Sequence, residues 1–418
     1  MSGCCHTTPR HWLPVRRLEG VRALLLENVH PDAVTVLTGA GVAVETADRA
    51  LGEDELIAAL PGVQLLGIRS KTDVSASALA AASDLLAIGA FCIGTNQIAL
   101  DAANTRGVAV FNAPFSNTRS VVELALAEIV ALTRRLTQKN ADMHAGVWDK
   151  SAEGAHEVRG RRLGIVGYGN IGAQLSVLAE ALGMSVAFYD TADKLALGNA
   201  KRCGSLDELL ACSDIVSLHV DGRSSNRDIF GEEQFALMPS GSLFLNLSRG
   251  FVVDHAALRA NIESGHLAGA AVDVFPHEPA GRGEEFVSEL RGLDNVILTP
   301  HIGGSTEEAQ QDIGRYVAGK LRDFIVDGAT SMSVNLPHLT LPARPDGHRI
   351  AHLHHNVPGV LAAINGLLAE HKVNIEGQFL GTRGELGYVL TDIAVDYPAD
   401  VLKALRDMDE TVRVRLLS

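Results

Sequence analysis

Short apolar runs alternate with amphipathic segments over the first quarter of the chain. Residues 21–27 (VRALLLE) and 63–68 (VQLLGI) have the apolar character of buried strands, and residues 53–60 between them have the pattern of a short helix. The apolar runs 85–88 and 108–111 continue the series. Strands that alternate with short helices are typical of a parallel α/β sheet.

A long helical segment follows at residues 117–147, which contain no glycine or proline before Gly146. We expect one continuous helix there, running from one domain to the next. A second, more regular series then begins at Arg161. It predicts strands at 163–166, 185–189, 214–220, 242–247, 270–275 and 296–299, and helices at 171–182, 205–211, 232–238 and 255–264. Six strands with crossovers in about 140 residues are what a doubly wound dinucleotide-binding domain requires.

The last part of the chain has a different rhythm. A long amphipathic helix is expected at 305–327, and a proline-rich linker follows at 336–347. The remaining segments predict the order βαββαβ, at residues 349–354, 358–370, 374–380, 388–395, 399–407 and 412–417. This order is that of a ferredoxin-like unit. The predicted fold class is therefore α/β, with two doubly wound parallel-sheet domains, one flavodoxin-like and one Rossmann-type, and a C-terminal ferredoxin-like βαββαβ domain.

Composition and charge limit the classes of partner and function that fit this chain. The 418 residues are too many for one core and suggest two or three domains. A net charge of −14 makes nucleic acid an unfavourable partner, although a local site for a small anion is compatible with it. No apolar run reaches the ~18 residues of a membrane span, and the N-terminus lacks the apolar core of a signal peptide. We therefore expect a soluble, cytoplasmic protein.

The cysteines support that compartment. There are five of them, with no C-x-x-C pair and no disulfide framework, which favours a reducing environment: Cys4, Cys5, Cys92, Cys203 and Cys212. Cys4, Cys5 and His6 form a conceivable metal site, but an unstructured terminus is the stronger interpretation. We expect no bound metal.

Residues 167–172 (GYGNIG) carry the G-x-G-x-x-G pattern between a predicted strand and a predicted helix. Gly167 permits the tight turn, Gly169 lets the backbone approach a pyrophosphate, and Gly172 lets helix and strand pack closely. Asp190 ends the next strand, close to the ~20-residue offset of the acid that accepts the ribose hydroxyls. Its charge would repel a 2′-phosphate, which favours NAD over NADP. The alternative for Asp190 is a turn or cap residue.

Three charged residues follow later strands of the same unit, at the edge where open α/β sheets bind ligands: Arg249, Glu278 and His301. Oxidation of an alcohol needs a base for the hydroxyl proton, a cation near the oxygen, and a carboxylate that holds the imidazole. Taken singly, each residue is more often a solvated charge or a structural histidine. The three together at one sheet edge favour a catalytic set.

Several motifs, in wording and order, carry a resemblance to a known family. They are AIGAFCIGT at 87–95, FNAPFSNTRS at 111–120, GYGNIG, LSRG at 247–250, DVFPHEP at 273–279 and TPHIGGST at 299–306. From about residue 22 onward the chain resembles the D-isomer-specific 2-hydroxyacid dehydrogenases, and within them the bacterial phosphoglycerate dehydrogenases that carry an ACT domain. The resemblance implies a discontinuous substrate-binding domain (16–116 and 304–345), an NAD-binding Rossmann domain (117–303), an active site in the cleft between them, and an ACT regulatory domain (346–418).

The resemblance also implies roles for single residues. Arg249 would hold the substrate carboxylate and carbonyl oxygen, His301 would be the acid/base, and Glu278 would pair with His301. The residues expected to bind NAD are Gly167, Gly169, Asn170, Ile171, Gly172, Asp190, Ser248, Arg249, Asp273, His301, Ile302, Gly303 and Gly304.

Arg69, Ser70 and Lys71 match the loop that binds the substrate phosphate in that family. Two cations beside a hydroxyl make a credible anion site in an acidic protein. The alternative is an exposed basic turn. Trp148 matches a tryptophan at subunit contacts, and the resemblance implies a homotetramer built as a dimer of dimers.

His354, Asn356 and Asn374 match the positions that bind serine as an effector. His352, His354 and His355 also suggest a metal, but on a strand only His352 and His354 share a face, and a third ligand is not evident.

The chain departs from relatives at the hinge, where it has Asp346-Gly347 and relatives often have two glycines. It departs again beside the effector asparagine, at His355 and Val357. These departures leave the strength of feedback inhibition open.

The function implied by the resemblance is NAD-dependent oxidation of 3-phosphoglycerate to 3-phosphohydroxypyruvate, the first step of L-serine biosynthesis, with feedback inhibition by serine. One alternative keeps the chemistry and changes the substrate, for example reduction of 2-oxoglutarate or another 2-oxoacid. Another alternative is an NAD-sensing corepressor on the same fold, which would keep the arginine, glutamate and histidine. The ACT domain and the phosphate-type loop argue against the corepressor.

Overall fold

In a computed structural model, which describes residues 20–279, 283–340, 347–394, 398 and 400–417, the chain forms two units. Unit 1 comprises Met1–Pro114 and Gln311–Ser418, and unit 2 comprises Phe115–Gln310. The conceivable metal site at the N-terminus and Asp346 of the hinge lie outside the described residues. The division into three domains with the expected bounds stays a prediction.

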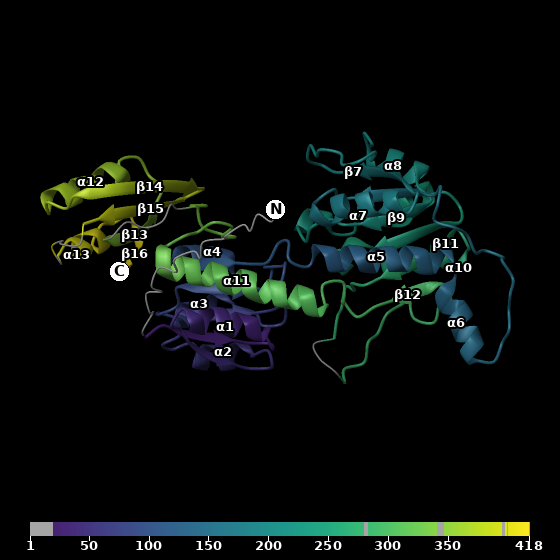
Figure 1. Cartoon of the computed structure of the whole chain (residues 1–418), viewed down its shortest axis with the longest axis horizontal. Coiled ribbons are helices and arrows are strands. Elements are labelled where there is room, and N and C mark those ends of the chain that lie inside the picture. The colour runs from purple at the N-terminus through teal and green to yellow at the C-terminus, as the bar shows by residue number, and fades with distance from the viewer. Residues whose placement is uncertain (1–19, 280–282, 341–346, 395–397, 399, 418) are drawn as a thin grey trace, which may run out of the picture. The chain divides into compact units, whose positions relative to one another are not determined.

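A five-stranded parallel sheet organises the first part of unit 1, which is the purple and dark blue part of the ribbon in Figure 1. Its strands are β1 (Arg22–Leu25), β2 (Ala43–Thr46), β3 (Leu65–Ile68), β4 (Ala87–Ala90) and β5 (Ala109–Phe111). Their order, β2-β1-β3-β4-β5, is the flavodoxin-like one, as expected. Strand β2 was not predicted, because it is an edge strand with mostly exposed residues and therefore has no apolar run.

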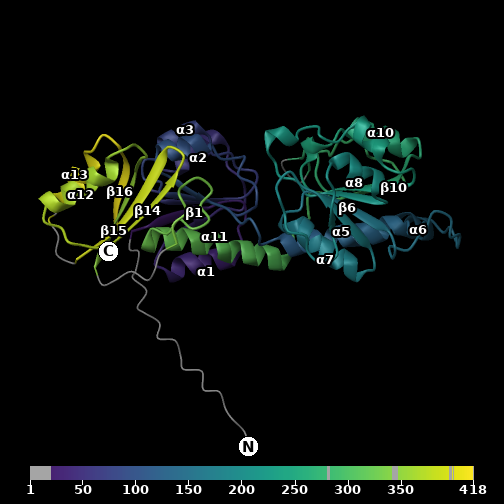
Figure 2. The same ribbon diagram turned by 90° about the horizontal axis from the view of Figure 1, so that it is seen from above.

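Helices cover both faces of this sheet (Figure 2). On one face, α1 (Pro31–Gly39) and α11 (Glu307–Asp327) bury Leu37 and Leu321 against the strands. On the other face lie α2 (Glu53–Ala59), α3 (Ala76–Ala81) and α4 (Leu100–Thr105). Gly314 allows α11 to approach α1 closely, because a Cβ there would lie 3.2 Å from the Cβ of His30.

Unit 2 is built on a seven-stranded parallel sheet in the order β12-β11-β10-β9-β6-β7-β8. The strands are β6 (Arg162–Val166), β7 (Ser185–Tyr189), β8 (Lys201–Arg202), β9 (Ile215–Leu218), β10 (Ser242–Asn246), β11 (Leu267–Val272) and β12 (Val296–Leu298). All six expected strands are present, and the order reverses at β6, as in a doubly wound dinucleotide-binding fold. The prediction missed only the two-residue edge strand β8.

The helices of unit 2 also form two layers. Helix α7 (Asn170–Ala181) packs with α5 (Thr118–Thr133) on one face. Helices α8 (Leu206–Cys212), α9 (Glu232–Leu237) and α10 (His255–Glu263) cover the other.

The prediction of one continuous helix at 117–147 is wrong. Helix α5 ends at Thr133, Arg135 takes a left-handed conformation with φ of 51°, and α6 (Leu136–His144) follows. The two helices differ in burial: α5 buries Val122 and Ile129 in the core, whereas no residue of α6 is buried. Core packing therefore stabilises α5 against the sheet, but no such packing stabilises a continuous helix through the residues that follow it.

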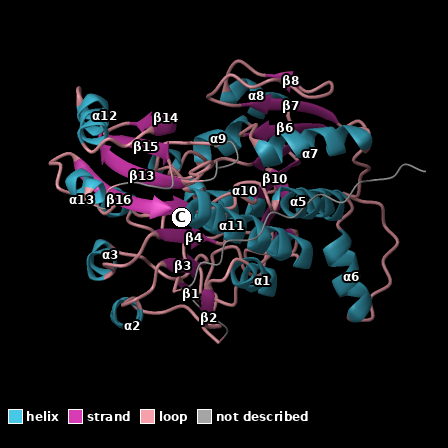
Figure 3. Cartoon of the chain, turned by 60° about the vertical axis from the view of Figure 1, so that its left-hand side comes forward, coloured by secondary structure: helices cyan, strands magenta, loops and turns pink. Residues whose placement is uncertain are grey.

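The C-terminal part has the expected βαββαβ order. Its elements are β13 (His348–His355), α12 (Val360–Glu370), β14 (Ile375–Arg383), β15 (Leu386–Ile393), α13 (Val401–Arg406) and β16 (Thr411–Leu417). The strands form an antiparallel sheet in the order β14-β15-β13-β16. Both helices lie on one side of this sheet (Figure 3). The ferredoxin-like prediction is confirmed.

The opposite face of that sheet packs on the end of α11. Leu353 and Leu390 join the same core as Leu321 and Phe324. The Tyr388 hydroxyl donates a hydrogen bond of 2.9 Å to the carbonyl of Gly328.

A buried ion pair reinforces this packing. The guanidinium of Arg349, which has no exposed surface, donates to Asp392 at 2.8 Å and to the carbonyl of Asp327 at 3.1 Å. The C-terminal domain is thus bound directly to α11 through apolar contacts and hydrogen bonds. None of the helices in the described ranges is both long and apolar enough to cross a lipid bilayer.

Candidate active site

The glycine-rich loop between β6 and α7 has the geometry that a dinucleotide site needs. Gly167 adopts φ of 91°, and a Cβ there would lie 2.5 Å from the carbonyl oxygen of His219. A Cβ at Gly172 would lie 2.3 Å from the carbonyl oxygen of Gly167, so only glycine lets helix and strand approach this closely. Gly169, at the helix N-terminus, has open space where its Cβ would be. These positions fit a diphosphate against the first N–H groups of α7.

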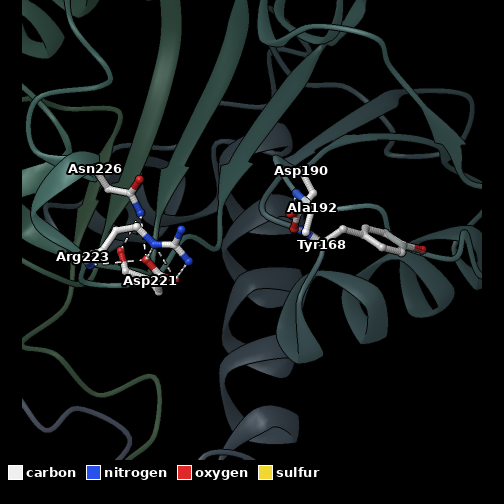
Figure 4. A network of polar contacts seen from close by, with 6 residues as sticks. All are labelled: Tyr168, Asp190, Ala192, Asp221, Arg223 and Asn226. Atoms are coloured by element: carbon white, nitrogen blue, oxygen red, sulfur yellow. Dashed lines mark hydrogen bonds and ion pairs between the residues drawn. The ribbon is translucent and has the colours of Figure 1, made fainter. Parts of the chain in front are cut away.

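Asp190 follows β7 and binds the glycine-rich loop (Figure 4). Its two carboxylate oxygens accept hydrogen bonds of 2.8 Å, one from the N–H of Tyr168 and one from the N–H of Ala192. Asp190 therefore does serve as a turn residue, and the expected contact with the ribose is compatible with that role.

A second polar group follows β9, on the other side of β6. Asp221 accepts from Nε of Arg223 at 2.7 Å and from the side chain of Asn226 at 3.0 Å (Figure 4). The hydrogen bond with Asp221 is the main cause that raises the pKa of Arg223 above its ordinary value, and the charge of Asp190 adds to it. A cation therefore lies within electrostatic reach of Asp190.

The three candidate catalytic residues follow strands β10, β11 and β12, and the structure brings them together. Nδ1 of His301 lies 2.8 Å from Oε2 of Glu278. The other oxygen of Glu278 accepts the N–H of Phe275 at 3.1 Å. Arg249 donates to the carbonyl of Ser248 at 2.6 Å, and its charge acts on both Glu278 and His301.

The charges of this group are mutually dependent. The hydrogen bond with Glu278 raises the pKa of His301, against the effect of burial, and the nearby Arg249 lowers it somewhat. Burial acts to raise the pKa of Glu278, but the hydrogen bond and charge of His301, together with the N–H of Phe275 and the charge of Arg249, outweigh burial and hold that pKa below its ordinary value. An imidazole that is oriented and charged by a carboxylate, beside a fixed guanidinium, is suited to moving the proton of an alcohol.

The backbone around His301 is held by Asp273. His301 itself adopts a left-handed conformation with φ of 54°, which costs a residue with a Cβ roughly 1–2 kcal/mol. Asp273, which is buried, accepts the N–H of Ile302 and the N–H of Gly303, each at 2.8 Å. It also accepts the hydroxyl of Thr299 at 2.6 Å. These bonds stabilise the strained turn that carries the histidine.

The expected phosphate loop follows β3 in unit 1, and a residue that sequence reasoning missed holds it. The buried carboxylate of Glu27 accepts the N–H groups of Arg69 at 3.1 Å, Lys71 at 3.0 Å and Thr72 at 2.9 Å. The side chain of Gln97 donates to the carbonyl of Arg69 at 2.6 Å. The available signal for Glu27 was a single acid at the end of the apolar run VRALLLE.

The structure does not bring the three effector positions together within one chain. His354 pairs with Gly387 near one end of β15, whereas Ile375, directly after Asn374, pairs with Ile393 at the other end. Six residues of strand separate these ends, which is roughly 20 Å.

His354 has one ring nitrogen engaged and one that is not. Nδ1 donates to the carbonyl of His355 at 2.8 Å, while the buried Nε2 has no hydrogen-bond partner among the described residues. The ring centroids of His352 and His354 lie 5.7 Å apart. Within the described ranges, no group of three or more histidine, cysteine or acidic side chains is arranged to hold a metal ion.

Two family descriptions match the chain. Residues 126–303 match the D-isomer specific 2-hydroxyacid dehydrogenase NAD-binding domain. Residues 350–413 match an ACT domain like that of the AHAS small subunit.

Similar proteins and similar solved structures agree with these two family descriptions. The chain is 49% identical to D-3-phosphoglycerate dehydrogenase of Haemophilus influenzae over 95% of its length and 97% of that protein, and equally identical to that of Escherichia coli, with the same coverage. The structure of D-lactate dehydrogenase from Aquifex aeolicus with NAD and lactic acid is similar at a TM-score of 0.64 and 27% identity, covering 72% of this chain and 95% of that one. With its NAD-binding domain, this chain belongs to the D-isomer specific 2-hydroxyacid dehydrogenases, which are NAD-dependent oxidoreductases, and within them to the family of D-3-phosphoglycerate dehydrogenases.

Proposed function

We propose that this enzyme oxidises 3-phosphoglycerate to 3-phosphohydroxypyruvate with NAD, as the first step of L-serine biosynthesis. The observation that carries the proposal is the loop after β3, where Arg69 and Lys71 flank a hydroxyl and Glu27 fixes the backbone. Such a loop recognises a phosphate by charge and by oriented donors. The names of the relatives support the same substrate.

The proposed roles follow from the contacts in unit 2. The glycine-rich loop and Asp190 would hold NAD, which would accept the hydride. Arg249 binds the substrate carboxylate and the oxygen that becomes the carbonyl. His301 takes the hydroxyl proton at the ring nitrogen Nε2, because Nδ1 is engaged with Glu278. Glu278 stabilises the resulting imidazolium.

A substrate panel tests this function. Purified enzyme is assayed with NAD and 3-phosphoglycerate, glycerate, D-lactate and 2-hydroxyglutarate, and with NADH and the matching 2-oxoacids. We expect 3-phosphoglycerate to give the highest kcat/KM, and 2-oxoglutarate reduction to be a secondary activity. Absence of turnover with 3-phosphoglycerate, together with good turnover of another acid, would reject the substrate.

We further propose that serine inhibits the enzyme at a site shared by two ACT domains. Strand β14 is an edge strand, exposed along most of its length. If two copies pair antiparallel through β14, Asn374 of the partner subunit comes to the end of the sheet that carries His354 and Asn356. The buried Nε2 of His354 then offers an acceptor, and the asparagines offer donors and acceptors, to the ammonium and carboxylate of serine. Such pairing fits a homotetramer built as a dimer of dimers.

Mixed assemblies test the shared site. The variants Asn356→Ala and Asn374→Ala should each abolish serine binding measured by calorimetry. In a mixed assembly, some pairs of ACT domains contain one subunit of each variant. Such a pair has one site in which both Asn356 and Asn374 are intact, so part of the serine inhibition should return. Serine binding that survives in both single variants would place the effector elsewhere.

The proposed compartment is the cytoplasm. Cys203 and Cys212 are free thiols in the structure, which is compatible with a reducing environment. Fractionation of cells that express the protein, with a cytoplasmic marker, would test this.

A further inference from the structure

A buried carboxyl group lies behind the turn that carries His301. Glu128 belongs to α5, which packs against the sheet of unit 2, and only 3% of its surface is exposed. Neither carboxyl oxygen has a hydrogen bond of good geometry to another described residue. The carboxylate of Asp273 and the hydroxyl of Thr299 are nevertheless close enough to act on its pKa, which Asp273 raises and Thr299 lowers by a smaller amount. The proposed reaction assigns no role to Glu128.

The environment of Glu128 favours its protonated form. Burial raises the pKa of Glu128 to about 8, and the negative charge of Asp273 contributes in the same direction. Asp273 is the charged group that acts on Glu128 from the packed elements around it, at the end of β11, while β12 presents the neutral Thr299. Asp273 already accepts three hydrogen bonds, so it is the member of the pair that is best stabilised as an anion.

We propose that Glu128 is a positioning residue of the active site: its protonated carboxyl group donates a hydrogen bond to the hydroxyl of Thr299, which donates in turn to Asp273 and so fixes the turn that carries His301. Each hydrogen in this relay has one acceptor. Thr299 needs an acceptor for its single hydrogen, which Asp273 supplies at 2.6 Å, and it accepts the hydrogen of Glu128 on its oxygen. Asp273 is left to hold the N–H groups of Ile302 and Gly303.

The relay fails when Glu128 loses its proton. Two carboxylates then compete for the one hydroxyl hydrogen of Thr299, and they repel each other in a buried space. A displaced Asp273 releases the N–H groups beyond His301, and the left-handed conformation of His301 loses its support. The chain should therefore lose activity at alkaline pH for a reason that does not involve the substrate.

Kinetics of Glu128→Gln and Glu128→Met test the proposal. The inference rests on the dehydrogenase reaction and not on the phosphate, so the acid with the highest turnover is used, with saturating NAD, from pH 6 to pH 10. The kcat/KM of the wild type should fall above about pH 8, by roughly tenfold at pH 9 if the ionised form is inactive. Glu128→Gln keeps a donor and cannot ionise, so this fall should disappear.

Glu128→Met removes both the donor and the titration. It should also lack the alkaline fall, but its kcat at pH 7.5 should be lower than that of Glu128→Gln by roughly two- to tenfold, since one hydrogen bond is lost. The KM for the substrate should change little in both variants. The matched control is Glu123→Gln, on the exposed side of α5, where Glu123 pairs with Arg119. This control should keep the wild-type profile.

A readout without substrate separates this inference from the proposed function. A group with a raised folded-state pKa stabilises the fold below its unfolded pKa, and that stability is lost as pH rises through the folded value. The melting temperature of the wild type should therefore fall relative to that of Glu128→Gln between about pH 5 and pH 9. A wild type and a Glu128→Gln variant with the same alkaline limb and the same pH dependence of melting would overturn the proposal. So would a Glu128→Met variant as active as Glu128→Gln at pH 7.5.

Discussion

The contact between His301 and Glu278 predicts how the activity depends on pH, and its geometry gives the size of the effect. In the oxidation of an alcohol the imidazole must begin neutral, so activity rises with pH through the pKa of His301. Glu278 raises that pKa because it stabilises the imidazolium. Glu278→Gln keeps an oxygen that accepts the Nδ1 hydrogen but removes the charge. The acid limb of the kcat/KM profile should therefore move to lower pH.

The distance gives the size of the effect. Two unit charges 2.8 Å apart interact by about 1.5 kcal/mol at the dielectric constant of water. We use this lower limit because 48% of the His301 side chain and 36% of the Glu278 side chain are exposed. Loss of this interaction should lower the pKa of His301 and so move the acid limb of the profile to lower pH. Loss of about 1.5 kcal/mol of imidazolium stabilisation also lowers the rate at the pH optimum by up to about tenfold.

The assay is kcat/KM from pH 5 to pH 9 for the wild type, Glu278→Gln and the control Glu263→Gln. Glu263 forms an exposed pair with Arg259 on α10, so its loss should leave the profile unchanged. The exposed His301–Glu278 pair should add no more than about 1 kcal/mol to the free energy of unfolding. That contribution is present where both groups are charged, above the pKa of Glu278 and below that of His301. An acid limb at the same pH in Glu278→Gln and in the wild type would refute the assigned pairing.

Three further predictions follow from other contacts. Asp190→Ala should raise the ratio of NADP to NAD activity at least about tenfold, because it removes the carboxylate and leaves the cation of Arg223 nearby; equal use of both cofactors by the wild type would contradict this. Glu27→Gln should raise the KM for the phosphorylated substrate several-fold and the KM for D-lactate much less, as measured by steady-state kinetics, since it weakens bonds to three N–H groups. Arg349→Met should lower the free energy of unfolding in urea by about 3–5 kcal/mol, and adding Asp392→Leu should recover part of that loss.

Much of the fold was predictable because its signals are local. Each buried parallel strand is a short apolar run, and the crossover helices lie between such runs, so all six main strands of unit 2 could be placed from the sequence. The failures came where packing outside the segment decides the structure. Helix α5 stops at Thr133 because its continuation has no core to cover, and β2 pairs with β1 although its residues are exposed. Neither fact is written in the residues of the segment itself.

The candidate site also has one part that local motifs predict and another part that they do not. Arg249, Glu278 and His301 occur in short motifs that follow strands, and their shared sheet edge follows from the doubly wound topology. The effector positions show the limit of motif matching. Each effector residue matches its position in the family motif, yet the register of the ACT sheet separates Asn374 from His354 within one chain. A motif assigns residue types to a site but does not say how many chains are needed to build it.

Two buried glutamates show why the support of the site could not be predicted. Glu27 ends an apolar strand and Glu128 lies in an apolar helix, so the sequence presents both as single acids among core residues. In the fold, Glu27 meets three N–H groups contributed by a loop about forty residues later, and all three bond to it. Neither carboxyl oxygen of Glu128 has a hydrogen-bond partner among the described residues, and the groups that act on it are the carboxylate of Asp273 and the hydroxyl of Thr299, which already donates to Asp273. The same side chain is therefore satisfied by donors in one place, and must supply the donor itself in the other.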